Sequence, residues 1–285
     1  MKRTIIMLSA KRCGSTAIFN SFQKHPEVNI CNDNQKISNH EIQFWTSAVK
    51  ALNGDISVLS KILKDSFPSL NCENFLGPDL SKKKIFDLWN YILENKGPIL
   101  FDKSPQYLSS KSALDLIFEY KSLGHDVKIF SLIRDPKDAI TSQYELWKEY
   151  TKEQNLNERE QDWLNKYKNL ELLNKFHDIP LFYYEKIANN PEYYFSKIYD
   201  YCTIKFDRES FSHFKKVSIN RYNLTFNKKI TSWNWSIEFE NHLKKYNYSK
   251  LENHNIIKKV FFNLKNFKRF IPLGIKNFLR KIIDF

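Results

Sequence analysis

The chain has 285 residues, of which 42% are hydrophobic and 15% aromatic, and its formal net charge at pH 7 is +13. This composition excludes a disordered chain, and the length suits one large α/β domain, with or without a small appendage. The charge favours anionic partners, namely nucleotides, acidic glycans, nucleic acid or anionic lipid, unless it reflects only an excess of solvated lysine.

The four cysteines are scattered, with no Cys-x-x-Cys pair and no histidine at metal-ligand spacing. This pattern argues against a zinc site and favours a reducing compartment. The apolar run near the amino terminus covers only 5–8, which is too short for a signal peptide. No stretch approaches the ~18 apolar residues of a membrane-spanning helix. We therefore predict a cytoplasmic protein.

The first twenty-five residues predict a β-strand, a short loop and the start of a helix. In such a turn, backbone N–H groups and the side chains of Arg12, Ser15 and Thr16 face one anion, for which phosphate is the obvious candidate. An ordinary strand–turn–helix connection is the alternative. The loop is not a Walker A motif, because its basic residues precede the only glycine and no Gly-Lys-Ser/Thr follows.

Strands and helices alternate along the rest of the chain. Periodicity predicts strands over 99–101, 127–133 and 179–184, and helices over 39–65 with a break at 54–55, 81–95, 107–123, from 136, and 163–177. The charged stretch 152–162 is predicted to be an exposed loop or lid. This alternation predicts an α/β fold whose central parallel sheet is flanked by helices and binds ligands at the carboxyl ends of its strands. Arg12, Lys103 and Arg134 each follow a predicted strand.

Arg134 and Ser142 form a second candidate phosphate site. Arg134 stands at the end of the strand over 127–133, and Ser142 lies two turns along the helix that follows. Both side chains can then face one phosphate, and the planar fork of arginine suits that role. The alternative is a helix-end salt bridge between Arg134 and Asp135 or Asp138.

The order Arg12, Cys13, Gly14, Ser15, Thr16, followed by His25-Pro-Glu-Val28, resembles the 5'-phosphosulfate loop of the sulfotransferases that use 3'-phosphoadenosine 5'-phosphosulfate (PAPS). The resemblance covers roughly residues 3–235 and implies a P-loop-like sulfotransferase fold with PAPS as cofactor, 3'-phosphoadenosine 5'-phosphate (PAP) as product and no metal. It implies that 12–16 hold the 5'-phosphosulfate.

The same resemblance assigns the other nucleotide contacts. It implies that Arg134 and Ser142 bind the 3'-phosphate, and that Tyr184, in a Phe-Tyr-Tyr-Glu segment, contacts adenine. A basic segment that covers the nucleotide in this family corresponds to Asn227–Trp233, which keeps two lysines and the tryptophan but lacks the family's two glycines. Lys228 and Lys229 are therefore candidate phosphate ligands, with a solvated lysine pair as the alternative.

Two further stretches, 39–45 and 101–108, resemble the glycan branch of the family, which includes the heparan sulfate sulfotransferases. This implies that Glu41 is the general base and that Lys103, together with Arg12, stabilises charge on the transferred group. His40 is a rival base, because a neutral imidazole works near pH 7. Glu41 as an exposed helix residue is the alternative. The expected acceptor is a hydroxyl of a glycan or glycolipid, and no nucleic-acid partner is expected.

The carboxyl-terminal stretch differs in character. We predict a sulfotransferase domain over 1–254 and a basic amphipathic helical segment over 255–285, in which 256–285 carries eight basic residues against one acid. This segment can lie on an anionic membrane, at the inner face of the cell membrane, or pack on the domain as a helix hairpin.

Two other function classes remain open at this stage. One is a P-loop kinase or nucleotide hydrolase, which the missing Gly-Lys-Ser/Thr disfavours. The other is a non-catalytic basic module that binds polyanions or membranes, which predicts salt-sensitive binding without nucleotide specificity.

Overall fold

The computed structural model describes residues 2–31, 41–147, 156–212, 214 and 228–248. His40, the predicted domain boundary at 254–255 and the basic segment 255–285 lie outside the described residues. The chain divides into two compact units. The first unit comprises Met1–Arg134 and Gln161–Val217, and the second comprises Asp135–Glu160 and Ser218–Phe285.

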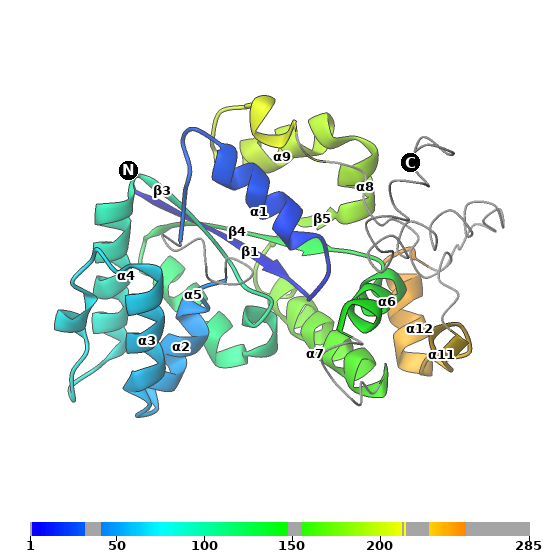
Figure 1. Cartoon of the computed structure of the whole chain (residues 1–285), viewed down its shortest axis with the longest axis horizontal. Coiled ribbons are helices and arrows are strands. Elements are labelled where there is room, and N and C mark those ends of the chain that lie inside the picture. The colour runs from blue at the N-terminus through cyan, green and yellow to red at the C-terminus, as the bar shows by residue number, and fades with distance from the viewer. Residues whose placement is uncertain (1, 32–40, 148–155, 213, 215–227, 249–285) are drawn as a thin grey trace, which may run out of the picture. The chain divides into compact units, whose positions relative to one another are not determined.

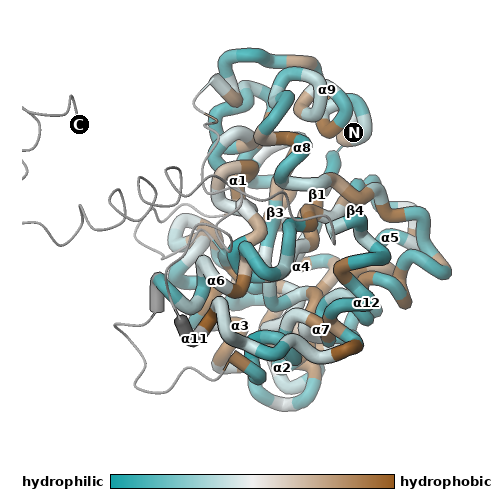
Figure 2. The backbone as a smooth tube through the Cα atoms, turned by 90° about the vertical axis from the view of Figure 1, so that its right-hand side faces the viewer, coloured by the Kyte–Doolittle hydropathy of each residue, from teal (hydrophilic) through white to brown (hydrophobic). Residues whose placement is uncertain are grey.

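The first unit is built on a five-stranded sheet in the order β2-β3-β1-β4-β5, and every neighbouring pair is parallel. The strands are β1 (Arg3–Ser9), β2 (Asn29–Ile30), β3 (Ile99–Lys103), β4 (Asp126–Ile133) and β5 (Leu181–Tyr183). The middle strands β1 and β4 are buried along almost their whole length, as near-continuous apolar runs in a parallel sheet predict. Figure 2 shows these strands within the unit, coloured by hydropathy. The predicted α/β fold with a central parallel sheet is confirmed.

Helices cover both faces of this sheet. On one face lie α1 (Ser15–Lys24) and α9 (Pro191–Cys202), and on the other lie α4 (Lys82–Lys96) and α5 (Lys111–Ser122), as Figure 1 shows. The unit also contains α2 (Phe44–Leu52), α3 (Ile56–Ser66), α8 (Tyr184–Asn189) and the 3₁₀ turns η2 (Cys72–Phe75), η3 (Tyr107–Ser109) and η4 (Glu209–Phe211).

Local signals explain several of the helix boundaries. The hydroxyl of Ser81 accepts a hydrogen bond from the backbone N–H of Lys84 and begins α4 as its N-cap, as predicted. Gly97, with φ 130°, ends that helix in a conformation that glycine adopts without strain. The break at 54–55 separates α2 from α3, also as predicted.

The strand register brings the ends of the strands to one edge. Met7 of β1 pairs with Lys103 of β3, Ser9 with Leu132 of β4, and Ile133 with Tyr183 of β5. The residues that follow these strands therefore emerge at the same edge of the sheet. This is the edge at which open parallel sheets bind ligands, at the point where strand connections change direction: β1 connects toward β2, whereas β3 connects to β4 on the other side of β1.

The prediction of an exposed loop or lid over 152–162 is wrong from Leu156 onward, and 152–155 lie outside the described residues. Helix α7 (Leu156–Asn174) begins at Leu156, not at 163, and Glu160 is buried. Its carboxylate accepts hydrogen bonds from the Trp233 indole N–H, at 2.9 Å, and from the Ser236 backbone N–H, at 2.8 Å. A charged stretch thus forms a buried helix start because distant parts of the chain satisfy its carboxylate.

The second unit holds α6 (Pro136–Trp147), the first turn of α7, α11 (Lys228–Thr231) and α12 (Ile237–Lys245). Lys137 of α6 donates to Glu240 of α12 at 2.6 Å, and its ammonium nitrogen lies 5.7 Å from the centroid of the Trp235 ring. Together with the Glu160 hydrogen bonds, these contacts hold the second unit together.

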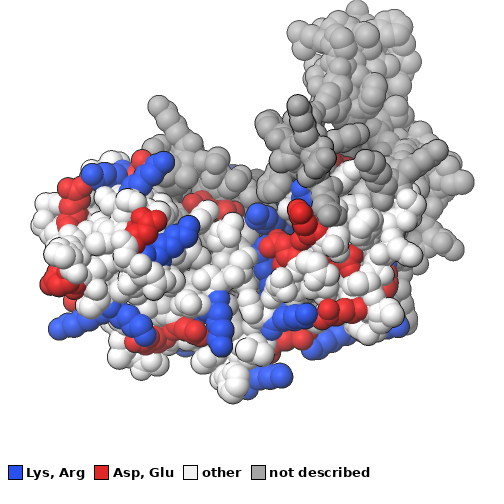
Figure 3. Space-filling view, turned by 90° about the horizontal axis from the view of Figure 1, so that it is seen from below, with Lys and Arg blue, Asp and Glu red and all other residues white. Residues whose placement is uncertain are grey.

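Charged side chains of both signs intermix on the face of the described residues seen in Figure 3. Most of the chain's excess positive charge belongs to 215–227 and 249–285, outside the described residues. Among the helices of the described part of the chain, none is long and apolar enough to cross a membrane.

Candidate active site

The loop between β1 and α1 has an unusual backbone. Arg12 and Gly14 both lie in the left-handed region, with φ values of 65° and 88°. Gly14 is required there for a second reason, because a Cβ atom at this position would lie 2.3 Å from two ring carbons of Tyr184. The tyrosine that sequence analysis assigned to the nucleotide therefore packs directly against the predicted phosphate loop.

The amino terminus of α1 is open to an anion. Gly14 is its N-cap and has no side chain to accept from the first N–H groups of the helix. Ser15 is buried and Thr16 is exposed in the first turn. At the end of β1, the buried hydroxyl of Ser9 has no hydrogen-bond partner among the described residues. The N–H groups of a first helical turn and a buried hydroxyl at one loop fit the oxygens of a phosphate or sulfate group.

Arg134 is buried, with 3% of its surface exposed, and it holds this loop in place. Its Nη1 donates to the carbonyl oxygen of Arg12 at 2.9 Å, and its guanidinium carbon lies 5.1 Å from the centroid of the Tyr184 ring. The Arg134 backbone N–H donates to the hydroxyl of Tyr167 at 3.4 Å. Arg134, predicted as a phosphate ligand, thus also positions the loop.

Cys13 is not a nucleophile in this arrangement. Its thiol is fully buried, and desolvation raises its pKa to about 11 despite the nearby charge of Arg134. A thiol with such a pKa stays protonated near neutral pH. Cys13 therefore contributes its backbone and its packing to the loop.

Glu41 and Lys103, two candidate residues from the family resemblance, form an ion pair. The Lys103 Nζ donates to the Glu41 Oε1 at 3.1 Å, although the two residues are 62 positions apart. The side chain of Lys103 is fully buried and that of Glu41 is 16% exposed. Burial lowers the pKa of Lys103, while the charge and hydrogen bond of Glu41 oppose that shift. The lysine nitrogen also lies 5.7 Å from the centroid of the Phe19 ring on α1, the helix that begins at the loop.

The remaining predicted ligands belong to the second unit. Ser142 is buried on α6, and Lys228 and Lys229 are the first two residues of α11. Arg134 is the last residue of the first segment of the first unit, whereas Ser142 belongs to the second unit.

Three buried polar residues at this edge escaped the sequence analysis. Tyr167 accepts a hydrogen bond from the Arg134 backbone and lowers the pKa of the buried Cys13 thiol, against the larger effect of desolvation. Asp102 and Tyr107 form a buried hydrogen bond next to Lys103. In a sequence, the helical spacing of a tyrosine predicts a core residue, so no local signal distinguishes Tyr167 from a packing residue.

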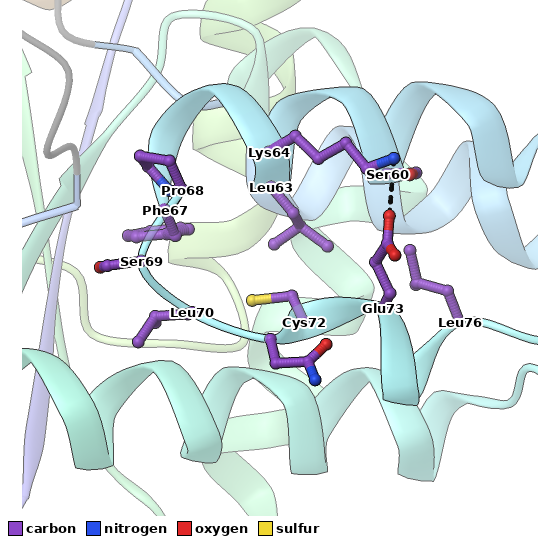
Figure 4. Close-up of a pocket in the computed structure, with 11 residues that line it drawn as sticks. Ser60, Leu63, Lys64, Phe67, Pro68, Ser69, Leu70, Cys72, Glu73 and Leu76 are labelled. Carbon is purple, nitrogen blue, oxygen red and sulfur yellow. Dashed lines mark ion pairs between the residues drawn. The ribbon is translucent and has the colours of Figure 1, made fainter.

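A cavity of about 490 Å³ lies away from these residues, between α3 and the stretch 67–76, as Figure 4 shows. Leu63, Phe67 and Cys72 line it, and an ion pair between Lys64 and Glu73, with 2.6 Å between nitrogen and oxygen, stands at its rim. None of the predicted site residues is among the described residues that line it.

Comparisons with known proteins agree with the fold. The family model described as "Sulfotransferase family" matches residues 4–208. Comparison with curated protein sequences gives no match.

Solved structures with the same fold are sulfotransferases. The sulfotransferase domain of the Synechococcus PCC 7002 olefin synthase aligns with a TM-score of 0.56 and 17% identity, covering 88% of this chain and 96% of that one. A sulfotransferase domain from the curacin biosynthetic pathway aligns equally well, with the same identity, covering 88% and 99%. A sulfotransferase from Mycobacterium avium has a TM-score of 0.53 at 14% identity, covering 86% and 76%. From the family match over most of its length and the fold of its sheet, the chain belongs to the sulfotransferase family.

Proposed function

We propose that the chain transfers a sulfuryl group from PAPS to a hydroxyl of a carbohydrate or glycoconjugate. The observation that carries this proposal is the ion pair between Glu41 and Lys103 at the carboxyl end of β3. A carboxylate that can accept a proton and a buried ammonium that can stabilise an oxyanion are the two groups that sulfuryl transfer to a hydroxyl requires.

The residues divide the work between binding and chemistry. Arg12 and the backbone of 13–16 bind the 5'-phosphosulfate at the open amino terminus of α1. Arg134 and Ser142 bind the 3'-phosphate, Tyr184 contacts adenine, and Lys228 with Lys229 binds phosphate from the second unit. These roles follow from the resemblance, and the packing of Tyr184 on Gly14 supports a nucleotide site at this loop.

In the reaction, Glu41 takes the proton of the acceptor hydroxyl as its oxygen forms a bond to sulfur. The bond between sulfur and the bridging oxygen of the donor breaks, and PAP leaves with that oxygen. Lys103 and Arg12 stabilise the charge that develops on the sulfuryl and bridging oxygens. Cationic side chains supply the charge stabilisation that magnesium supplies in phosphoryl transfer, so we expect no metal requirement.

The acceptor class rests on the glycan-type stretches 39–45 and 101–108. The solved neighbours above come from an olefin synthase and the curacin pathway, so an acceptor panel should set glycans and glycolipids against hydroxyl compounds that carry no sugar, such as long-chain alcohols. Transfer to the compounds without a sugar alone would replace the carbohydrate acceptor while leaving the PAPS chemistry in place.

The donor is tested by thermal stabilisation with PAP, compared with ADP and with ATP plus magnesium. We expect a shift specific to PAP that is reduced in Arg134→Lys, because lysine keeps the charge but loses the fork that reaches the Arg12 carbonyl. Arg208→Lys is the matched control, since that side chain is 72% exposed and pairs with Glu192 at the surface.

Other outcomes would redirect the assignment. Stabilisation by ATP with magnesium alone would favour a kinase or nucleotide hydrolase. No nucleotide effect, combined with salt-sensitive polyanion binding, would favour the non-catalytic module. Contact of 256–285 with an anionic membrane stays a prediction, which liposome sedimentation of the full chain and of a chain lacking that segment tests.

A further inference from the structure

Both carboxylate oxygens of Glu160 bind one short segment of the chain. Glu160 lies near the start of α7 and is 1% exposed. Its Oε2 accepts a hydrogen bond from the Trp233 indole N–H at 2.9 Å, and its Oε1 accepts one from the Ser236 backbone N–H at 2.8 Å. All three residues belong to the second unit. Burying a carboxylate is costly unless hydrogen bonds compensate for the lost water, and these two contacts offset that cost.

The contact with Ser236 completes the start of α12. Ser236 is the N-cap of this helix, and its hydroxyl accepts a hydrogen bond from the Phe239 backbone N–H at 3.2 Å. In a capping box, a glutamate or glutamine at the position of Phe239 accepts from the N-cap N–H in return. Phe239 is apolar and fully buried, and Glu160 accepts from that N–H instead. A residue 76 positions away thus supplies half of this helix cap.

The contact with Trp233 extends the anchor to α11. This helix has four residues, begins with Lys228 and Lys229, and contains the fully buried Ile230. The Trp233 backbone N–H donates to the carbonyl oxygen of Ile230 at 3.2 Å, while its indole N–H donates to Glu160. A helix this short has little stability of its own, so its position depends on such anchors. Glu160 therefore fixes the connection between α11 and α12 at both ends.

We propose that Glu160 is a positioning residue that fixes 228–236 and thereby holds the backbone of Lys228 and Lys229 in place for a nucleotide phosphate. The effect on nucleotide binding rests on the proposed function, in which these lysines bind phosphate, whereas the effect on the segment does not. When a binding segment is in place only part of the time, the apparent Kd rises by the inverse of that fraction. Glu41 and Lys103 belong to the first unit, so the rate at saturating PAPS should stay the same.

The test replaces one acceptor oxygen. Glu160→Gln introduces an amide NH₂ group, which cannot accept, so one of the two N–H donors loses its partner. We expect amide hydrogen exchange in 228–240, measured by mass spectrometry, to rise about tenfold, as loss of roughly one hydrogen bond implies. The Kd for PAP in calorimetric titration and the KM for PAPS should rise about 3- to 10-fold, while kcat stays within about twofold. Glu158→Gln is the matched control, because that carboxylate is exposed in the first turn of the same helix.

A double-mutant cycle separates action through the lysines from a general loss of structure. In a Lys228→Ala/Lys229→Ala background, adding Glu160→Gln should change the Kd for PAP by less than about twofold, because the contacts that Glu160 positions are already missing. An equal rise of the Kd in both backgrounds would overturn the link to the lysines.

Trp233→Phe keeps the proposal falsifiable should Glu160→Gln fold poorly. This variant keeps an aromatic ring, removes the indole donor, and should also raise exchange in 228–240. Unchanged exchange there in both variants would overturn the positioning role. Faster exchange with an unchanged Kd for PAP would overturn its consequence for the nucleotide. If the parent itself does not bind PAP, the proposed function fails, and the exchange result still decides whether Glu160 holds the segment.

Discussion

The two sides of the candidate site are built in different ways. The phosphate-loop side, residues 10–16 with Arg134 and Tyr184, depends on backbone conformation. Its two left-handed residues are Arg12 and Gly14, and Gly14 has no room for a Cβ atom. The Glu41–Lys103 side depends on one charged pair between distant segments, next to a buried hydrogen bond between Asp102 and Tyr107. In the proposed function, the first side presents N–H donors to the 5'-phosphosulfate, and the second presents a general base and a cation.

This difference separates binding from chemistry. An anion-binding loop works through the fixed direction of its N–H groups. Substitutions there should therefore change the affinity for PAPS and the stability of the fold. A base and a cation act on the reacting atoms, so errors there should appear in kcat. The predictions below ask whether the two sides can be damaged independently.

The largest expected effect is on the chemical side. Glu41→Gln should lower kcat about 10²- to 10⁴-fold, the usual contribution of a general base, while PAP affinity stays within about twofold. The variant also leaves Lys103 buried without its carboxylate, so rates should be measured well below its melting temperature. Initial rates with labelled PAPS and calorimetric titration with PAP give both numbers.

The control for that variant is another lysine–glutamate pair. Glu119→Gln removes a carboxylate that accepts from Lys82 at 2.6 Å on the surface, and it should change neither quantity. Equal losses of rate and PAP affinity in Glu41→Gln would contradict the division between the two sides. An unchanged rate would remove Glu41 as the base and direct attention to His40.

A smaller effect concerns pH and Asp102. Burial raises the pKa of its carboxyl from 3.8 to about 7, so the folded protein holds this proton more tightly than the unfolded chain does. The stability that the protonated Asp102 contributes to the folded state is therefore fully present below about pH 4. It is lost as the pH rises to about 7, and stability does not change further with this group above that pH. The difference in pKa corresponds to at most about 4 kcal/mol. Asp102→Asn, which does not titrate, should gain stability over the parent between pH 4 and pH 8 in urea denaturation.

Asp79→Asn provides a control of opposite sign. The hydrogen bond from Lys84 lowers the pKa of this fully exposed carboxyl, so its contribution is present at neutral pH and lost as the pH falls. Asp79→Asn should therefore be slightly less stable than the parent at pH 7 and equally stable in acid. A constant difference between Asp102→Asn and the parent from pH 4 to pH 8 would show that Asp102 does not titrate in this range.

The contrast between the two sides also explains what the sequence revealed. The strands and most helices follow from local apolar periodicity, and the loop is visible because 12–16 are contiguous. Lys103 was predicted at a strand end for the same reason. Its contact with Glu41 was not predicted: the family resemblance implied only the roles of the two residues, and no local pattern specifies a pair 62 residues apart.

The features that sequence analysis misplaced or missed depend on structural detail that local patterns do not specify. Glu160 is charged and sits in a charged stretch, yet the Trp233 and Ser236 N–H groups from the second unit's later segment make a buried helix start favourable there. Tyr184 begins α8 and does not end the strand, because β5 stops at Tyr183. Asp102 and Tyr107 form a buried hydrogen bond across five residues, which local periodicity does not reveal.

The smallest expected effect isolates the close approach at the phosphate loop. Gly14 and Gly124 have nearly the same backbone, with φ values of 88° and 90°, but only Gly14 has a neighbour where a Cβ would lie. Each glycine-to-alanine change should cost about 1–2 kcal/mol for the left-handed backbone. Gly14→Ala should cost about 1–3 kcal/mol more, because the Tyr184 ring must move away from Arg134, whose guanidinium carbon lies 5.1 Å from it. It should also weaken PAP binding, whereas Gly124→Ala should not. Urea denaturation measures the difference, and equal destabilisation by the two changes would mean that Tyr184 does not hold the loop, leaving the backbone alone to shape the phosphate-loop side.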